Sequence, residues 1–219
     1  PFDGSTKDYS GYSHDGTATN GAKFTNDSAM GLGALHFDGT DDYVRVPHDN
    51  SLNLNDTLTI EAWVWLNSHK WSYILGKNYY GTSKFSLGYH TTPSSWWVAY
   101  DTTSLSFGDQ LLNQWVHLAV TYDKSLATQN WKTYQNGVAT ETKNSQLGAM
   151  HNTHPLDIGR SSGDARYWPG KIDEIRIYNR TLSAEEIEQH YWASARSGLI
   201  LNNTQTKKNE RWNATVTLF

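Results

Sequence analysis

The chain has 219 residues, of which 18% are charged and 13% aromatic, with 10 Trp, 13 Tyr and no cysteine. A net charge of −4 without a basic stripe argues against nucleic-acid binding, and no apolar run is long enough to cross a membrane as a helix. The lack of cysteine excludes disulfides as a source of stability. Abundant aromatic and hydroxyl-bearing residues with few charges favour a β-sandwich, and a chain of this length can bury a sizeable core.

Alternating apolar and polar residues predict a series of short strands. Residues 58–66 alternate with a period of two, which places Ile60 on one face and Glu61 on the other. Asn136 and Gly137 lie between two alternating runs and predict a type I′ hairpin turn, because both residues tolerate a positive φ. Further strands are expected within residues 34–47, 71–77, 84–90, 94–102, 114–123, 131–142, 156–160 and 170–179.

One helix is predicted, in residues 182–192. Ser183 can cap its first turn and Glu186 can return the hydrogen bond, which is a capping box. About ten short strands, dense turns and one short C-terminal helix predict an all-β fold, an antiparallel two-sheet jelly-roll sandwich. We expect this sandwich to occupy residues 1–196. We expect residues 197–219 to form a linker or an extra strand that leads to a neighbouring domain or subunit.

Six segments occur in an order that is typical of one family. They are DYSGYSHDGTAT, ALHFDGTDDYVRVPHDNSLNLNDTLTIEAWV, NQWVHLAVTYD, YQNGV, LDIGR and GKIDEIRIYNRTLSAEEIEQHY. Through them residues 1–192 resemble a laminin-G-like jelly roll of the concanavalin A-like lectin/glucanase superfamily. The resemblance implies two stacked antiparallel sheets and an extracellular role in binding or adhesion. It implies binding more than catalysis, and it does not name the ligand.

The same superfamily includes laminarinase-type hydrolases, which carry Glu-x-Asp-x-(x)-Glu on one strand as nucleophile and acid. The nearest match in this chain is KIDEIR, residues 171–176, which retains Asp173. Lys171 and Arg176 stand at the two outer glutamate positions. A cationic side chain can be neither nucleophile nor acid/base in this role, so the sequence predicts that the chain is not an enzyme.

Related jelly rolls often hold a structural calcium ion where the first and last strands meet, so the resemblance implies such a site here. Calcium takes six to eight oxygen ligands, which mix carboxylates with backbone carbonyls. By alternation Asp173 shares the core-side face of its strand with Ile175 and Ile177, and a buried carboxylate must be paired, hydrogen-bonded or bound to metal. The candidate calcium ligands are Asp8, Asp38, the Gly39 carbonyl and Asp173.

Each of these acids also has an explanation without metal. Asp38 can cap the Gly39 turn through its backbone amides, and Asp173 can pair with an arginine or accept backbone N–H groups. Asp41 and Asp42 point in alternate directions, so at least one of them is expected to face solvent. The sequence therefore leaves calcium binding and simple turn capping as alternatives.

Aromatic side chains near loops could form flat platforms for sugar rings, with amides and carboxylates placed for the hydroxyl groups. Adjacent Trp96 and Trp97 must point to opposite faces of a strand, so one of them points away from the core. Trp63 and Trp115 are expected in the core. The predicted ligand-binding residues are Trp71, Tyr79, Tyr80, Trp96, Tyr100, Asp101, Tyr167 and Trp168.

Three functions from different classes are compatible with the sequence. The first is a noncatalytic binding or adhesion module for a glycan or a cell-surface polymer. The second is a structural subunit of a cell-surface layer or filament, in which residues 197–219 add a strand to a neighbouring copy or domain. The third is the hydrolase that the missing glutamates disfavour. Several N-x-Ser/Thr sequons and the resemblance favour an extracellular or cell-surface location, and the initial Pro1 suggests a piece processed or excised from a longer protein.

Overall fold

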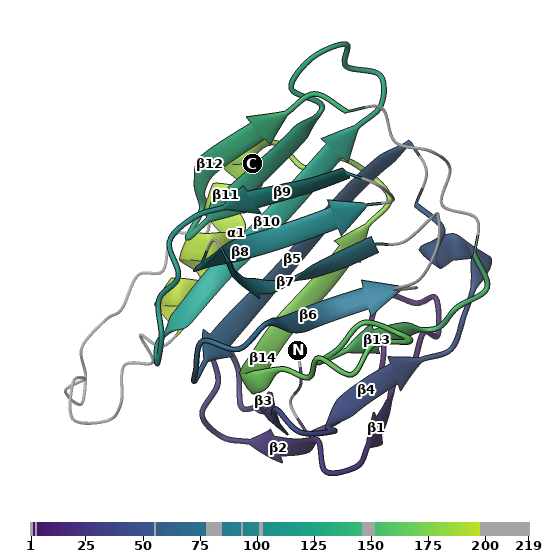
Figure 1. Ribbon diagram of the computed structural model, residues 1–219, viewed down its shortest axis with the longest axis vertical. Helices are drawn as coiled ribbons and strands as arrows, with labels where there is room; N and C mark the ends of the chain where they lie inside the picture. The colour runs from purple at the N-terminus through teal and green to yellow at the C-terminus, as the bar shows by residue number, and fades with distance from the viewer. Residues whose placement is uncertain are drawn as a thin grey trace, which may run out of the picture.

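The computed structural model describes residues 2, 4–54, 56–77, 85–92, 94–100, 103–145 and 152–197. Within them, two seven-stranded antiparallel sheets stack face to face, which confirms the predicted jelly-roll sandwich (Figure 1). Sheet A has the order β1 (Thr17–Thr19), β4 (Tyr43–Val46), β13 (Leu156–Ile158), β6 (Ser72–Lys77), β7 (Phe85–Thr91), β8 (Ser94–Tyr100) and β9 (Thr103–Phe107). Sheet B has the order β12 (Val138–Lys143), β11 (Trp131–Gln135), β10 (Trp115–Asp123), β5 (Thr57–Leu66), β14 (Pro169–Tyr178), β3 (Ala34–Asp38) and β2 (Lys23–Thr25).

The inner faces of the two sheets form one hydrophobic core. In sheet B, Val64 and Leu118 are fully buried, and Leu87 and Val98 face them from sheet A. Burial of such side chains stabilises the fold by roughly 1.5–3 kcal/mol each, before conformational entropy is subtracted. Because side chains alternate along a strand, this core fixes which residues of each strand reach the outer faces.

Two local predictions are confirmed. Asn136 and Gly137 join β11 to β12 with φ values of 52° and 78°, as a type I′ turn requires. Glu186 N donates to Ser183 Oγ at 3.2 Å, and Ser183 N donates to Glu186 Oε2 at 2.8 Å, which completes the capping box. This box opens helix α1 (Ala184–Ser197), while a short 3-10 helix, η1 (Asn50–Leu52), follows β4.

The remainder of the predicted C-terminal segment, residues 198–219, lies outside the described residues. A linker or extra strand over residues 197–219 therefore stays a prediction. In the part of the chain that the structure describes, no helix is both long and apolar enough to cross a membrane.

Helix α1 covers part of the outer face of sheet B (Figure 1). Tyr191 of the helix stacks on Trp63 of β5, with ring centroids 5.6 Å apart. Beneath the helix, His190 Nδ1 lies 2.8 Å from Glu61 Oε2, and His117 Nε2 lies 3.6 Å from Glu61 Oε1. Glu61 and His117 are 1% and 2% exposed. Burial lowers the pKa of His117 to about 4, because the imidazolium form loses its hydration there.

A β-bulge interrupts β14. Its pairing with β5 shifts register between Asp173 and Arg176, and Glu174 has a φ of 48°. Asp173 lies opposite Trp63, whose ring packs against α1, so both side chains are on the outer face of sheet B. Ile175 packs against the core. The prediction that Asp173 shares a face with Ile175 is therefore wrong, because the extra residue of the bulge reverses the alternation.

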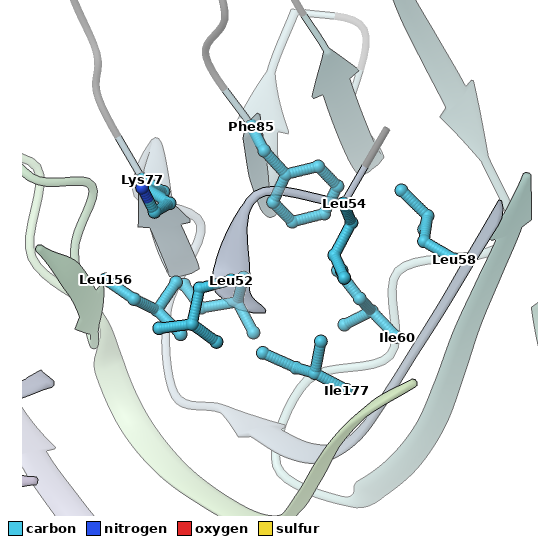
Figure 2. Close-up of a pocket in the computed structure, with 9 residues that line it drawn as sticks. Leu52, Leu54, Leu58, Ile60, Lys77, Phe85, Leu156 and Ile177 are labelled. Carbon is cyan, nitrogen blue, oxygen red and sulfur yellow. The ribbon is translucent and has the colours of Figure 1, made fainter. Parts of the chain in front are cut away.

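Lys77 is buried at the end of β6. Its ammonium donates to Asn53 Oδ1 at 3.1 Å and to Asn152 Oδ1 at 2.8 Å, and it lies 3.2 Å from His48 Nδ1. Burial lowers the pKa of Lys77 to about 8. Lys77 and Leu156 both line a small cavity of about 20 Å³, and Figure 2 shows the residues around it. Lys77 thus connects two loops to the edge of the core through its hydrogen bonds.

We predict that His117 makes stability depend on pH. Its pKa is about 4 in the fold and near 6.5 in the unfolded chain, so the unfolded chain binds more protons between these values and stability rises with pH across them. From pH 4 to pH 7, the free-energy difference between the wild type and His117→Gln should grow by up to about 3 kcal/mol in favour of the wild type. Urea unfolding at each pH measures it.

His154→Gln, at an exposed histidine, is the matched control and should change the pH dependence little. Burial raises the pKa of Asp173 to about 6, which acts in the opposite direction, but Asp173 is present in both proteins and cancels in the comparison. A difference between the wild type and His117→Gln that stays constant from pH 4 to pH 7 would contradict the prediction.

Candidate ligand-binding face

Figure 1 looks onto the outer face of sheet A, with α1 behind sheet B. Along β8, Trp96 and Val98 point into the core, while Trp97 between them lies on the outer face and is half-buried. Trp97 lies opposite Gly88 of β7. A Cβ atom at Gly88 would come within 2.3 Å of the Ser72 carbonyl oxygen, so this position requires glycine. The surface beside Trp97 is therefore backbone rather than side chain.

Aromatic rings gather around Trp97 on this face. We define the aromatic cluster as Trp71, Tyr73, His90, Trp97 and Arg166. The rings of Tyr73 and Trp97 are 5.8 Å apart between centroids, and those of Trp71 and His90 are 4.4 Å apart. Arg166 Cζ lies 3.5 Å from the centre of the Trp71 ring, which is a cation–π contact. The rings of Trp71, His90 and Trp97 are thus half-buried on this face, while the Tyr73 ring is fully buried.

Charged groups are fixed beside these rings. Arg166 Nη1 donates to Asp164 Oδ2 at 2.6 Å and to the Tyr73 hydroxyl at 3.1 Å. The side chain of Asp164 is only 7% exposed, so this ion pair is well ordered by its surroundings. Trp71 Nε1 has no hydrogen-bond partner among the described residues. That atom is buried, so it is not offered to a ligand on the surface. The aromatic cluster therefore combines flat apolar surface with a held guanidinium, which suits sugar recognition.

A second group lies next to the aromatic cluster on the same face. Arg45 of β4 makes two hydrogen bonds of 2.9 Å to Asp157 of β13, and Arg160 Nε donates to the same carboxylate at 2.8 Å. The side chain of Asp157 is fully buried, and its hydrogen bonds raise the pKa of Arg45. Arg160 also lies 3.7 Å over the Tyr43 ring and donates to the Tyr167 hydroxyl at 3.2 Å. Two cations share one carboxylate, so this arginine pair carries net positive charge.

The structure brings together part of the predicted ligand-binding set. Trp71 and Tyr167 are half-buried and belong to the two groups described above. Tyr79, Tyr80 and Asp101 lie outside the described residues, so nothing follows for them. Their contact with a ligand stays a prediction.

Three of the predicted platforms need correction. Trp96, Tyr100 and Trp168 are fully buried, so their rings are not available to a ligand on the surface. Trp96 and Tyr100 are four residues apart on β8 and therefore both point inward, and Trp168 stacks on Trp96 with centroids 6.3 Å apart. Their place on the outer face is taken by Trp97, in agreement with the expectation that one of the two adjacent tryptophans points away from the core.

Sequence reasoning missed several members of this face. His90 could have been placed by extending the alternation of β7, in which Leu87 and Tyr89 point inward. Arg45 and Arg160 gave no sequence signal, because they meet only through the pairing of β4 with β13. Arg166 lies in a connection without periodicity, so its contact with the cluster could not be inferred.

The four predicted calcium ligands do not form one site. Asp38 lies opposite Pro169, four residues before Asp173 on β14, so the backbones of Asp38 and Asp173 are roughly 13 Å apart. Asp8 accepts a hydrogen bond from His14 N at 3.0 Å within its own loop. Asp173 accepts hydrogen bonds from the backbone amides of Met30 and Glu174, as its explanation without metal predicts.

Three acids at the turn between β3 and β4 do converge. Carboxylate oxygens of Asp38, Asp41 and Asp42 lie within 4.8 Å of one another. Asp38 accepts hydrogen bonds from amides of the turn, as the capping alternative predicts, and Asp42 accepts one from Asp38 N at 2.9 Å. Burial, together with the charges of Asp38 and Asp41, raises the pKa of Asp42. Lys70 Nζ donates to the Gly39 carbonyl. This acidic turn could hold a metal ion.

The family model of the concanavalin A-like lectin/glucanases superfamily, Laminin_G_3, matches residues 38–188. The chain belongs to this family. No curated protein matches the sequence of this laminin-G-like chain. The family includes both lectins and glucanases by its description, so membership establishes the fold and leaves the activity open.

Solved structures share this fold at low sequence identity. The binding domain of Paraclostridial Mosquitocidal Protein 1 is 15% identical, with a TM-score of 0.66, and the match covers 84% of this chain and 48% of that one. Domain 4 of AbnA, an extracellular arabinanase from Geobacillus stearothermophilus, solved with arabinotriose, is 18% identical, with a TM-score of 0.63 and coverage of 84% and 92%. A Trypanosoma rangeli sialidase is 19% identical, with a TM-score of 0.58 and coverage of 76% and 28%. The chain thus spans about half of the mosquitocidal-protein binding domain and nearly all of the arabinanase domain.

We predict that Asp157 holds the second group together. Replacement by Ala leaves two guanidinium groups without their shared carboxylate. The free energy of unfolding should therefore fall by about 3 kcal/mol, which is the lower end of the range for a broken buried ion pair. We expect the lower end because Arg45 can turn toward water. Urea unfolding measures the loss. Asp56→Ala breaks an exposed pair with Lys124 and should cost less than about 1 kcal/mol. Equal losses in the two variants would contradict the prediction.

Proposed function

We propose that the chain is a noncatalytic carbohydrate-binding module that works outside the cell. The observation that carries this proposal is the aromatic cluster on the open outer face of sheet A. Its half-buried indole rings can stack on the apolar faces of sugars, while Arg166 and Asp164 can meet hydroxyl groups. On the other outer face, that of sheet B, α1 covers Trp63 and Glu61.

Two further observations support this proposal. A binding domain is among the structures of similar fold, and another of these structures, domain 4 of an arabinanase, was solved with arabinotriose. In this chain the acid that resembles a catalytic motif, Asp173, is 0% exposed on the outer face of sheet B, away from the aromatic cluster. Exposed sequons at Asn26 and Asn179 agree with a location outside the cell.

The proposal predicts that Trp97 carries affinity. In an array that includes arabino-oligosaccharides, the full chain should bind a subset of glycans, and Trp97→Ala should weaken that binding by about tenfold or more through loss of ring stacking. Titration calorimetry with the best array ligand measures the change. Trp192→Ala is the matched control, because Trp192 is 46% exposed on α1 at the opposite side of the sandwich.

Two outcomes would contradict the proposed site. One is a glycan affinity that is unchanged in Trp97→Ala. The other is an equal loss in Trp192→Ala, which would place the ligand on the helix side. Release of reducing sugar from the bound glycan by the wild type would contradict the noncatalytic part of the proposal.

We also propose that the acidic turn of Asp38, Asp41 and Asp42 binds calcium. The donor chemistry fits, because carboxylates and nearby carbonyls are ligands that calcium prefers. A cation would offset the mutual repulsion of the three acids, two of which raise the pKa of Asp42. The lysine on the Gly39 carbonyl leaves that oxygen less available, so the carboxylates would supply most of the protein ligands.

Calcium should then raise the melting temperature by about 5 °C or more over that in a chelator. Asp41→Asn should reduce this increase, since Asp41 is exposed and the turn-capping hydrogen bonds belong to its neighbours. Asp56→Asn, at another exposed acid, should leave it unchanged. Identical melting of the wild type in calcium and in chelator would exclude the site.

A further inference from the structure

The arginine pair, Arg45 and Arg160, has more positive charge than its shared carboxylate can offset. Arg45 bonds both oxygens of Asp157 through Nε and Nη2, so this one guanidinium already neutralises the acid. Arg160 adds a further hydrogen bond to the same carboxylate, and neither arginine forms an ion pair with any other acid of the described residues. One positive charge is therefore left unbalanced on this face, in a chain whose net charge is −4.

The ring of Tyr43 lies beside both guanidinium groups. Arg160 Cζ is 3.7 Å from the centre of this ring, and Arg45 Cζ is 5.2 Å from it. The Tyr167 hydroxyl also accepts a hydrogen bond from Arg160 Nη1 at 3.2 Å. Side chains that are already held in place lose little conformational entropy when a ligand binds. The arginine pair is thus preorganised to meet an anion.

The arginine pair also keeps donors for such an anion. A guanidinium carries five N–H groups, of which Arg45 uses only one edge on Asp157. The Asp157 side chain is fully buried, whereas that of Arg45 is 40% exposed, so solvent reaches the other edge. Two parallel N–H groups of a guanidinium match the two oxygens of a carboxylate, as Asp157 itself shows. A carboxylate that arrives from solvent can therefore bond the arginine pair in the same way.

One connection links the arginine pair to the aromatic cluster. Residues 159–168, between β13 and β14, carry Arg160 of the pair and Arg166 of the cluster. Gly159 N donates to the Ile74 carbonyl of β6 at 2.7 Å, which fastens this connection to sheet A. The two groups are therefore parts of one surface whose positions are fixed relative to each other.

The distance between the two groups suits a chain of several sugars. Arg45 lies on β4 and Trp97 on β8, with β13, β6 and β7 between them (Figure 1). At about 4.8 Å between neighbouring strands, roughly 19 Å separates the two positions. A single sugar ring is much shorter than this, so an oligosaccharide is needed to contact both groups.

We propose that the arginine pair makes this face selective for acidic glycans, in which a sugar carboxylate bonds Arg45 and Arg160 while other rings of the same chain stack on the aromatic cluster. This inference rests on the proposed carbohydrate binding, because it names the class of glycan that the same face takes. A carboxylate offsets the unbalanced charge in charge-assisted hydrogen bonds. A neutral glycan leaves that charge as it is and gains only stacking and ordinary hydrogen bonds.

Glycans that differ only in charge test the proposal. An array presents oligosaccharides that contain uronic acids, in several linkages, beside the methyl esters of the same oligosaccharides. The best acid form and its ester are then titrated into the full chain in a calorimeter. The acid form should bind about tenfold more tightly or better. Salt at about 1 M, where the Debye length is about 3 Å, should reduce this preference and leave the affinity of the ester nearly unchanged.

Arg45→Gln separates recognition of charge from support of the fold. It should weaken binding of the acid form by about fivefold or more and leave binding of the ester unchanged, because Arg160 still pairs with Asp157 and the aromatic cluster is intact. A purely structural role of Arg45 would change both affinities alike. Arg180→Gln is the matched control, since Arg180 is exposed and pairs with Glu186 near the start of α1. A melting curve shows whether each variant is folded.

The results distinguish this inference from the function on which it rests. Equal affinities for the acid form and its ester, or tighter binding of the ester, would overturn acidic selectivity and leave carbohydrate binding in place. An equal effect of Arg45→Gln on both forms would also overturn it, because the arginine pair would then lie outside the ligand site. No binding of any glycan, acidic or neutral, would overturn both proposals.

Discussion

The two sheets share one hydrophobic core, and this constraint fixes which side chains of each strand point inward and which point outward. Inward positions of the paired strands must be apolar, and the next residue along a strand must then face outward. Trp96 and Trp97 show the rule at adjacent positions, since the first is 0% exposed and the second is half-buried on the outer face. A one-residue slip in this register would exchange the two rings and remove the aromatic cluster.

The two outer faces differ because a helix lies over part of only one of them among the described residues. Helix α1 lies on sheet B, where Tyr191 stacks on Trp63 and His190 reaches the buried Glu61. Glu61 and His117 are thereby removed from solvent, and they act in stability rather than at an open site. Sheet A has no such cover among the described residues, and its rings and arginines face outward (Figure 1). The proposed ligand-binding site therefore lies on sheet A, and the buried Glu61–His117 pair lies under the helix on sheet B.

Period-two alternation, the Asn136-Gly137 turn and the Ser183 capping box are local signals, and each is confirmed. Asp173 was placed wrongly because a bulge gives no periodic signal, and Glu174 has the backbone conformation that produces it. The arginine pair around Asp157 could not be predicted, because its members are brought together by strand pairing across distant parts of the chain.

Gly88 has a wider consequence for how such a face can diversify. A side chain there would collide with the backbone of β6, so the flat area next to Trp97 cannot be altered by substitution at Gly88. The surface of this area can therefore be altered only through the rings and charged groups around it, such as Trp71, His90 and Trp97, while the backbone beneath stays the same.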